Sequence, residues 1–259
     1  MLTHIPSPLQ QFRLLHTLPS FNPQSPPTRR RGDPTHLLII LGSGGHTAEM
    51  LSLLQDLDTR SYTHRTYVIS SGDSFSALKA QEFESRLADT RRKTAEKKEG
   101  RVEAGKAGEA GTYSIRIVPR ARRIHQSALT APWDCLRCLL ACLHLLTTPP
   151  TPIPPPQSSS PALTRLPTTT LPDLILLNGP ATATILVIAS LLLRFVGWRG
   201  SRGKMRSIYI ESWARVRKLS LSGRILVAAG ACERVLVQWE GLREGMGGRG
   251  VEFRGCLVR

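Results

Sequence analysis

The chain has 259 residues, enough to bury the core of one sizeable α/β domain or of two small ones, and its 41% hydrophobic content argues against a largely disordered protein. Its formal net charge of +16, from 35 Lys and Arg against 19 Asp and Glu, favours contact with nucleic acid, a phosphorylated ligand or an acidic membrane surface. The five cysteines form no even disulfide framework and follow no secretory signal, so a reducing, cytosolic setting is expected.

The first segment of the chain predicts local disorder. Residues 1–34 carry seven prolines and three consecutive arginines without a sustained apolar period. We interpret them as a disordered, basic and proline-rich leader, and residues 35–259 as one folded domain.

The next segment, residues 37–57, reads LLIILGSGGHTAEMLSLLQDL. Its first five residues are typical of a strand buried on both faces, and its later apolar residues recur at three- and four-residue steps, as on a helix. The turn from Gly42 to Gly45 would leave free backbone N–H groups at a helix N-terminus and let an anion approach them. It matches neither the dinucleotide fingerprint nor the lysine-containing phosphate loop, so a purely structural turn is an equal alternative.

Five further strands and four further helices are predicted in alternation. The strands are expected at residues 65–71, 113–118, 173–177, 207–211 and 234–238, and the helices at about 74–98, 134–146, 181–196 and 220–229. Two inserts interrupt the pattern: residues 93–111, rich in Lys, Glu, Gly and Ala, and residues 147–172, which hold nine prolines. The alternation predicts a parallel sheet with right-handed crossovers.

Residues 174–193 form a stretch of twenty residues without a charged side chain, which a hydropathy profile would take for a membrane span. The turn from Asn178 to Pro180 interrupts it, and a polar turn in lipid would leave backbone groups unpaired. A strand and a helix of a buried sheet therefore fit better, although one face of the helix could meet a membrane.

Polar turns follow the strands at the edge where an open parallel sheet binds ligands. The expected rim comprises Gly42 to His46, Gly72 to Ser74, Arg120 with Arg122 and Arg123, Asn178 to Pro180, and Glu211 with Ser212. Backbone N–H groups, arginines and a histidine together suit a diphosphate. The alternative is that the glycines and the asparagine only make turns.

Three side chains at this rim are candidates for chemistry, and each has a structural alternative. His46 could contact a ligand or only cap a helix. Asp73 could act as a base toward a hydroxyl or cap the helix that follows it. Glu211 could orient Arg215 and Arg217 or merely pair with them.

Other clusters give no reason to expect a metal or a cofactor. Cys135, Cys138 and Cys142 share one helix face near His144 but have no second pair of ligands elsewhere, which favours a buried or membrane-facing helix over a zinc site. The arginines come with only 5% aromatic residues and no recognisable nucleic-acid-binding motif. We therefore expect no metal, no cofactor and no nucleic-acid partner.

Six motifs in order closely resemble the membrane-anchor subunit of the UDP-N-acetylglucosamine transferase of dolichol-linked oligosaccharide assembly: GSGGHTAEML, YVISSGDSFS, IVPRARRIHQS, DLILLNGPATA, IYIESWARVRKLSLSGRIL and VLVQWEGL. The likeness spans residues 37–258 apart from the two inserts. It implies an α/β fold, a Rossmann-like parallel sheet with helices on both faces, similar to the acceptor-binding half of a two-domain glycosyltransferase of the GT-B type.

The resemblance implies a function shared between two subunits. A separate catalytic subunit would bind the sugar nucleotide, and the pair would add the second N-acetylglucosamine to dolichol-diphosphate-linked N-acetylglucosamine. The expected location is the cytosolic face of the endoplasmic reticulum membrane, or the nuclear envelope. One alternative is a membrane scaffold without a working acceptor site, and a less favoured one is a basic nucleic-acid-binding protein.

The resemblance also implies roles for individual residues. The glycine-histidine turn is similar to that of the bacterial transferase that glycosylates lipid-linked muramyl peptide. The acceptor diphosphate would contact Ser43, Gly44, Gly45, Thr47, Arg120, Arg122, Asn178 and Gly179. The catalytic candidates are His46, Asp73 and Glu211. The partner subunit would dock on Gly255, Cys256, Leu257, Val258 and Arg259.

The chain departs from the family pattern in three places. No run of eighteen apolar residues occurs before residue 37, where the family usually has a membrane-spanning helix. Either the true start lies upstream, or the helices at 134–146 and 181–196 bind the membrane together with the arginines. Ala181 and Ala183 replace the usual Gly and Cys after the asparagine turn, and an aspartate common near Cys232 and Glu233 is missing.

Overall fold

The computed structural model describes residues 16–22, 33–59, 61–96, 111–122, 126, 130–151, 153, 171–247 and 250–258. Most of the predicted leader and the greater part of both predicted inserts lie outside these residues. Within the leader, His16 and Thr17 are helical and residues 18–22 form bends and turns. The Ser20 backbone N–H donates a 3.4 Å hydrogen bond to the Gly230 carbonyl. This part of the leader therefore packs on the folded domain.

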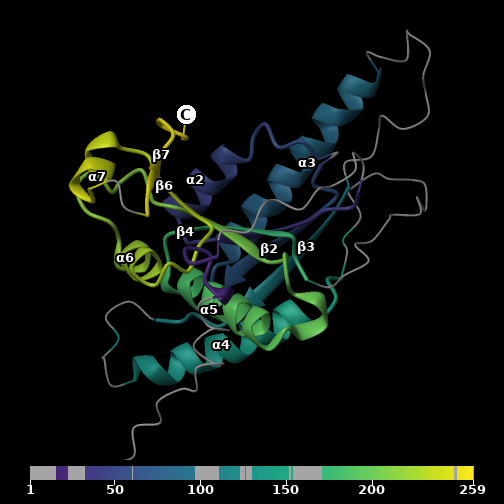
Figure 1. The fold of residues 1–259 in the computed structure, drawn as a ribbon. Coiled ribbons are helices and arrows are strands. Elements are labelled where there is room, and N and C mark those ends of the chain that lie inside the picture. The colour runs from purple at the N-terminus through teal and green to yellow at the C-terminus, as the bar shows by residue number, and fades with distance from the viewer. Residues whose placement is uncertain are drawn as a thin grey trace, which may run out of the picture.

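A seven-stranded, all-parallel sheet forms the centre of the molecule, in the order β3-β2-β1-β4-β5-β6-β7 (Figure 1). The strands are β1 (His36–Leu41), β2 (His64–Ser70), β3 (Thr112–Val118), β4 (Leu174–Asn178), β5 (Arg206–Ile210), β6 (Arg234–Val237) and β7 (Glu252–Phe253). The first six confirm the predicted strands within one or two residues. The predicted class, a parallel α/β sheet, is thereby confirmed.

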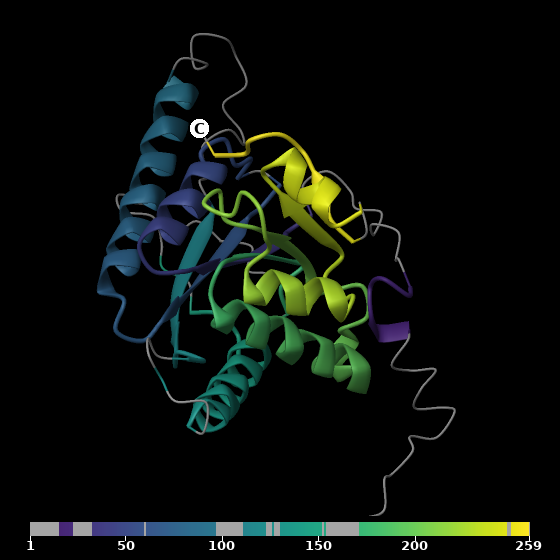
Figure 2. The same cartoon turned by 90° about the vertical axis from the view of Figure 1, so that its left-hand side faces the viewer.

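Helices cover both faces of the sheet. They are α2 (Gly45–Leu53), α3 (Ser74–Glu96), α4 (Ala131–Thr147), α5 (Ala181–Val196), α6 (Leu221–Ala228) and α7 (Glu240–Gly245), with a short 3₁₀ turn, η1 (Trp198–Gly200). Figures 1 and 2 show α2 and α3 on one face of the sheet and α4, α5 and α6 on the other. No described helix is long and apolar enough to cross a membrane.

Strand β1 explains why the sheet has a core on each face. Leu37, Ile39 and Leu41 pack with α2 and α3, whereas Leu38 and Ile40 pack with α4 and α5. Successive side chains of a strand point to opposite faces, and a strand between two helical layers must therefore be apolar at every position. This is why the sequence shows a continuous apolar run here instead of an alternating one.

Several element boundaries differ from the sequence-based expectation. Helix α2 ends at Leu53, before the last leucine of its predicted apolar face. Helix α3 ends at Glu96, two residues before its predicted end and four residues inside the predicted first insert. In the second insert, Ile153 forms an antiparallel bridge with Tyr113 of β3. Part of that insert is thus fixed to the edge strand of the sheet.

Candidate functional site

The sheet has a topological switch point between β1 and β4. The chain leaves β1 into α2 on one face, whereas it leaves the neighbouring β4 into α5 on the other face (Figure 2). Loops that separate in this way create a crevice at the carboxyl ends of the strands, where open α/β sheets bind ligands. Two of the turns predicted to form the rim, 42–45 and 178–180, follow these two strands and so lie together.

The glycine-rich turn presents an open helix N-terminus. Gly44 occupies the N-cap position of α2 with φ of 61°, and no side chain caps the helix there. A Cβ atom added to Gly44 or Gly45 would meet no atom within 4 Å, and Ser43 beside them is exposed. Backbone N–H groups of the first helical turn are therefore accessible to an anion, as the ligand-binding interpretation of this turn requires.

The imidazole of His46 lies against the turn that follows β4. A Cβ atom on Gly179, whose φ is +68°, would lie 2.6 Å from the His46 ring, and one on Gly42 would lie 2.7 Å from the His46 Cβ. The Asn178 side-chain amide donates a 2.9 Å hydrogen bond to the His46 carbonyl. Asn178 and Gly179 therefore hold and accommodate the histidine.

Two buried polar atoms at this junction have no hydrogen-bond partner among the described residues. They are His46 Nδ1 and Asn178 Oδ1, and Asn178 as a whole is only 1% exposed. Buried polar atoms in folded proteins are almost always paired with protein, water or ligand. Both atoms adjoin the glycine turn, which adds to the case for a binding site.

Thr47 does not reach the open side of the turn, contrary to its predicted contact with the diphosphate. Its side chain is fully buried, donates to the Gly42 carbonyl and lies 2.7 Å from the Ser76 hydroxyl. It instead supports the turn from inside, because it joins the end of β1 to the start of α3.

Asp73 adopts the alternative role of a helix cap. Its two carboxylate oxygens accept hydrogen bonds from the Ser76 backbone N–H (3.1 Å) and the Ser76 hydroxyl (2.7 Å), in the first turn of α3. An aspartate before a helix commonly satisfies N–H groups in this way. These are the contacts expected from the capping alternative.

Glu211 is buried and holds the start of α6. One oxygen of its carboxylate accepts from the Ser220 backbone N–H at 2.8 Å and the Ser220 hydroxyl at 3.0 Å, and the other from the Ser212 N–H at 3.2 Å. Its carboxylate is thus directed at these serines, and the predicted partners Arg215 and Arg217 lie in an exposed loop. In the structure, Glu211 therefore fixes the loop after β5 and the start of α6.

The predicted arginines occupy the end of β3. Arg120 donates a 3.1 Å hydrogen bond from Nε to the Ser71 carbonyl, and Arg122 is exposed. The Thr182 hydroxyl in α5 lies 3.3 Å from the Ser70 hydroxyl and accepts from the Ala121 N–H. The ends of β2 and β3 therefore meet the start of α5 at the same edge of the sheet. Arg123 lies outside the described residues.

Sequence reasoning missed Glu49 of α2. Its Oε1 accepts a 2.8 Å hydrogen bond from the Ser212 hydroxyl, and its Oε2 lies 3.9 Å from His46 Nδ1. The available signal was its spacing, because residues three apart on a helix are neighbours. The contact with Ser212 joins α2 to the loop after β5 and has no counterpart in the local sequence.

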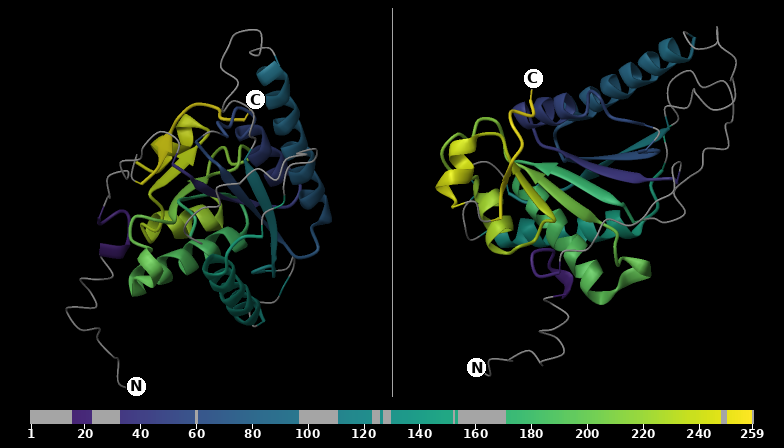
Figure 3. Two further views of the ribbon diagram at one scale, coloured as in Figure 1. Left: turned by 90° about the vertical axis from the view of Figure 1, so that its right-hand side faces the viewer. Right: turned by 45° about the horizontal axis from the view of Figure 1, so that its top comes forward.

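The predicted docking tail reaches the same edge. The Val258 N–H donates to the Gln238 side-chain oxygen at 3.3 Å, and the Gln238 amide donates to the Glu211 carbonyl at 3.1 Å. Figures 2 and 3 place the C-terminal end near α2. Cys256 is exposed, and Arg259 lies outside the described residues.

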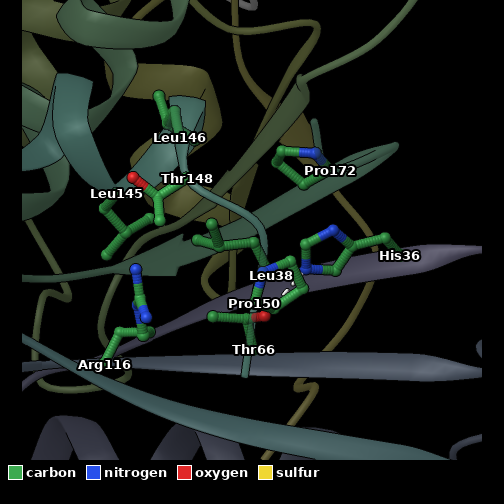
Figure 4. Close-up of a pocket in the computed structure, with 9 residues that line it drawn as sticks. All are labelled: His36, Leu38, Thr66, Arg116, Leu145, Leu146, Thr148, Pro150 and Pro172. Atoms are coloured by element: carbon green, nitrogen blue, oxygen red, sulfur yellow. Dashed lines mark hydrogen bonds between the residues drawn. The ribbon is translucent and has the colours of Figure 1, made fainter. Parts of the chain in front are cut away.

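Two other features lie away from this edge. A cavity of about 10 Å³, room for a single water, lies between β1, β2, β3 and the end of α4 (Figure 4). Its lining includes His36, Thr66 and Arg116, and it is too small for a sugar or a lipid. Cys138 and Cys142 are fully buried in the core with α5, the structural alternative to a metal site.

These features define a class: a doubly wound, parallel α/β domain with a glycine-histidine turn at its switch point. The family model described as "Oligosaccharide biosynthesis protein Alg14 like" matches residues 37–257. The chain belongs to this family, which confirms the family predicted from the six motifs.

Named relatives cover most of the chain. Proteins called UDP-N-acetylglucosamine transferase subunit alg14 are 38% identical in Aspergillus fumigatus (81% of this chain, 100% of the relative) and 35% identical in Schizosaccharomyces pombe (80% and 77%). The Rattus norvegicus protein of that name is 33% identical (80% and 77%). Among solved structures, MurG of Acinetobacter baumannii shares 10% identity over 79% of this chain and 41% of its own, with a TM-score of 0.42.

Proposed function

We propose that this chain is the non-autonomous subunit of a UDP-N-acetylglucosamine transferase, which binds a lipid-diphosphate acceptor and recruits the catalytic subunit to the membrane. The pair would add the second N-acetylglucosamine to dolichol-diphosphate-linked N-acetylglucosamine at the cytosolic face of the endoplasmic reticulum. Family membership and the name of the relatives support a role as a subunit of a UDP-N-acetylglucosamine transferase. One observation carries the acceptor site: the open start of α2 beside the buried edge of His46.

The proposed diphosphate site uses backbone more than side chains. The N–H groups at the start of α2 would bind phosphate oxygens, since the positive end of the helix dipole and the unpaired donors both favour an anion there. Gly44 and Gly45 leave the space for that approach, and the Ser43 hydroxyl lies on the same exposed turn. Arg120 and Arg122 supply positive charge from the end of β3, which lies two strands from β1 in the sheet.

His46 is the titratable side chain best placed for chemistry in this proposal. Its side chain is 35% exposed. The carboxylates of Asp73 and Glu211, by contrast, accept hydrogen bonds from backbone N–H groups at the starts of α3 and α6. The acceptor hydroxyl would attack the anomeric carbon of the sugar nucleotide held by the partner, the bond to UDP would break, and His46 would take the hydroxyl proton. UDP would leave with the electron pair of the broken bond.

The proposed membrane contact uses the outer faces of α4 and α5. Both helices cover the same face of the sheet and pack on one another (Figure 1). Their exposed apolar side chains recur at helical spacing: Trp133, Leu136 and Leu140 on α4, and Ile188, Leu192 and Val196 on α5. Exposed cations flank these rows at Arg137, Arg199 and Arg202. Apolar rows with neighbouring cations suit the surface of an anionic bilayer.

The acceptor assay tests this function on the pair of subunits. The purified chain alone should transfer no sugar, and co-expression with the small sugar-nucleotide-binding subunit should restore chitobiosyl-lipid synthesis. His46→Ala combined with Gly44→Ala should abolish activity of the pair while the two subunits still co-purify. Transfer by the chain alone would refute the proposal, and full activity of the double variant would favour the scaffold alternative.

A further inference from the structure

We propose that Glu49 is a positioning residue that sets the orientation and the protonated nitrogen of the His46 imidazole, and that Ser212 holds Glu49 in place. The inference rests on the proposed role of His46 at the acceptor site. It assigns a function to a carboxylate that the sequence did not single out.

The position of Glu49 carries the argument. Its side chain is only 16% exposed, and one of its oxygens is fixed by the 2.8 Å hydrogen bond from Ser212. The other oxygen lies 3.9 Å from His46 Nδ1, a buried nitrogen without a hydrogen-bond partner among the described residues. A carboxylate anchored on one side and facing an unpaired ring nitrogen on the other is arranged to accept a proton from it.

The distance of 3.9 Å exceeds a hydrogen bond and calls for a small movement. Contacts of this kind are often long before a ligand binds and shorten in the complex. The ring has little freedom to turn elsewhere, because Gly42 and Gly179 border it closely. Rotation of the Glu49 carboxylate is the simpler route to a hydrogen bond.

The consequence is a defined tautomer of the neutral imidazole. When Nδ1 carries the proton and donates to Glu49, Nε2 keeps a lone pair that can accept a proton or a hydrogen bond. A base requires this tautomer, and the second ring nitrogen of a functional histidine is commonly fixed by such a partner. Glu49 would supply that partner here.

Ser212 connects this arrangement to the other side of the sheet. Its hydroxyl accepts from the Ala214 N–H at 3.3 Å and donates its proton to Glu49, while its own N–H donates to Glu211. Glu211 in turn holds the start of α6. The chain of contacts therefore runs from α6 through Glu211, Ser212 and Glu49 to His46.

The ring tautomer can be measured directly. In ¹⁵N-histidine-labelled chain, long-range ¹H–¹⁵N spectra should show neutral His46 protonated mainly at Nδ1, with the signal assigned by its loss in His46→Ala. Glu49→Ala should remove that preference. Glu49→Gln retains length and an oxygen for Ser212 but presents N–H to the ring, so it should favour the opposite tautomer.

Activity of the two-subunit enzyme gives the second readout. Glu49→Ala and Glu49→Gln should each lower kcat roughly 10- to 100-fold, by analogy with the outer partners of metal-bound histidines, with little change in KM for the lipid acceptor. Glu82→Ala serves as the matched control, because Glu82 is a glutamate of α3 that pairs with Lys79 at the surface. It should leave both readouts unchanged.

Failure of this inference and failure of the proposed function give different results. An unchanged His46 tautomer in Glu49→Ala, or an altered tautomer with wild-type kcat, overturns the positioning role of Glu49. The proposed acceptor site fails instead if the pair carrying His46→Ala and Gly44→Ala keeps full activity.

Discussion

The position of His46 depends on two residues without side chains. Gly42 borders its Cβ and Gly179 borders its ring, and a methyl group at either position would overlap the histidine. Gly44 and Gly45, two residues along the same turn, border open space. Gly42 and Gly179 thus make space for the His46 side chain, whereas Gly44 and Gly45 leave the backbone of the turn open to solvent.

Two glycine substitutions should separate these roles. Gly179→Ala should displace the imidazole and force a Cβ into positive φ, at a cost of about 1–2 kcal/mol or more in the free energy of unfolding, and should abolish activity of the pair. Gly45→Ala should leave urea-induced unfolding unchanged or slightly raise the stability, because it adds a helix-favouring residue in open space. It should nevertheless raise KM for the lipid acceptor. A normal KM in Gly45→Ala would show that no ligand approaches this turn closely.

Two buried histidines at the opposite edge predict a pH dependence of stability. Burial, together with the charge of His64, lowers the pKa of His36 to about 3, and burial with the nearby Arg65 lowers that of His64 to about 4. Both residues are neutral in the folded protein at pH 7, with hydrogen bonds to Thr66 and Thr112.

The direction of the pH dependence of stability follows from whether the folded or the unfolded chain binds protons at the higher pH. As the pH falls below the ordinary histidine pKa of 6.5, the unfolded chain takes up protons that the folded chain cannot. Stability should thus be complete above about pH 6.5 and decline toward pH 4 by about 1.4 kcal/mol per pH unit for each histidine. Urea unfolding at several pH values should show a shallower decline for the double variant His36→Gln, His64→Asn. An equally steep decline would assign the effect to other groups.

At the scale of elements, the outer faces of α4 and α5 give a test of membrane contact. Leu136→Glu with Leu140→Glu places two carboxylates in the apolar row of α4 and should prevent flotation with vesicles that contain anionic lipid. Phe75→Glu is the control, since Phe75 is equally exposed but lies on α3 at the opposite face. Release by high salt would indicate contact through arginines alone, and equal flotation of both variants would exclude this surface.

The sequence predicted the elements whose pattern is local. Apolar runs located β1 to β6, and the segments between them were predicted as helices that correspond to α2 to α6. Helix α7 and strand β7 were missed, since the glycine-rich segment around them carries no such run. Strand β7 has two residues and owes its existence to pairing with β6. Elements of this kind depend on the rest of the sheet.

The site was predictable in location and less so in its side chains. Topology brings the glycine turn and the asparagine turn together once the strands are known to be parallel. Whether Thr47 faces a ligand or the protein depends on Ser76, which lies in a different motif. Asp73 and Ser76 belong to the same motif, and the capping of α3 by Asp73 was one of the two alternatives that the sequence left open. The contact between Glu49 and Ser212 joins segments 163 residues apart and could not be read from spacing.

At the scale of the whole molecule, the C-terminal tail tests the docking of the partner. Deletion of residues 255–259 should leave thermal unfolding nearly unchanged, because the hydrogen bond from Val258 to Gln238 is the tail's described link to the sheet. The same deletion should abolish co-purification of the sugar-nucleotide-binding subunit and with it the activity of the pair. Undiminished co-purification would place the docking surface elsewhere.

The position of α5 between the sheet and the proposed membrane surface determines how far the ligand-binding edge of the sheet lies from the bilayer. If the outer side of α4 and α5 rests on a bilayer, the ends of β1 and β4 stand above the headgroups by about the thickness of one helix, about 10 Å. A polyprenol could then keep its hydrocarbon in the leaflet while its diphosphate extends upward to the start of α2. The helical layer would act as a spacer matched to the headgroup of a membrane-bound substrate.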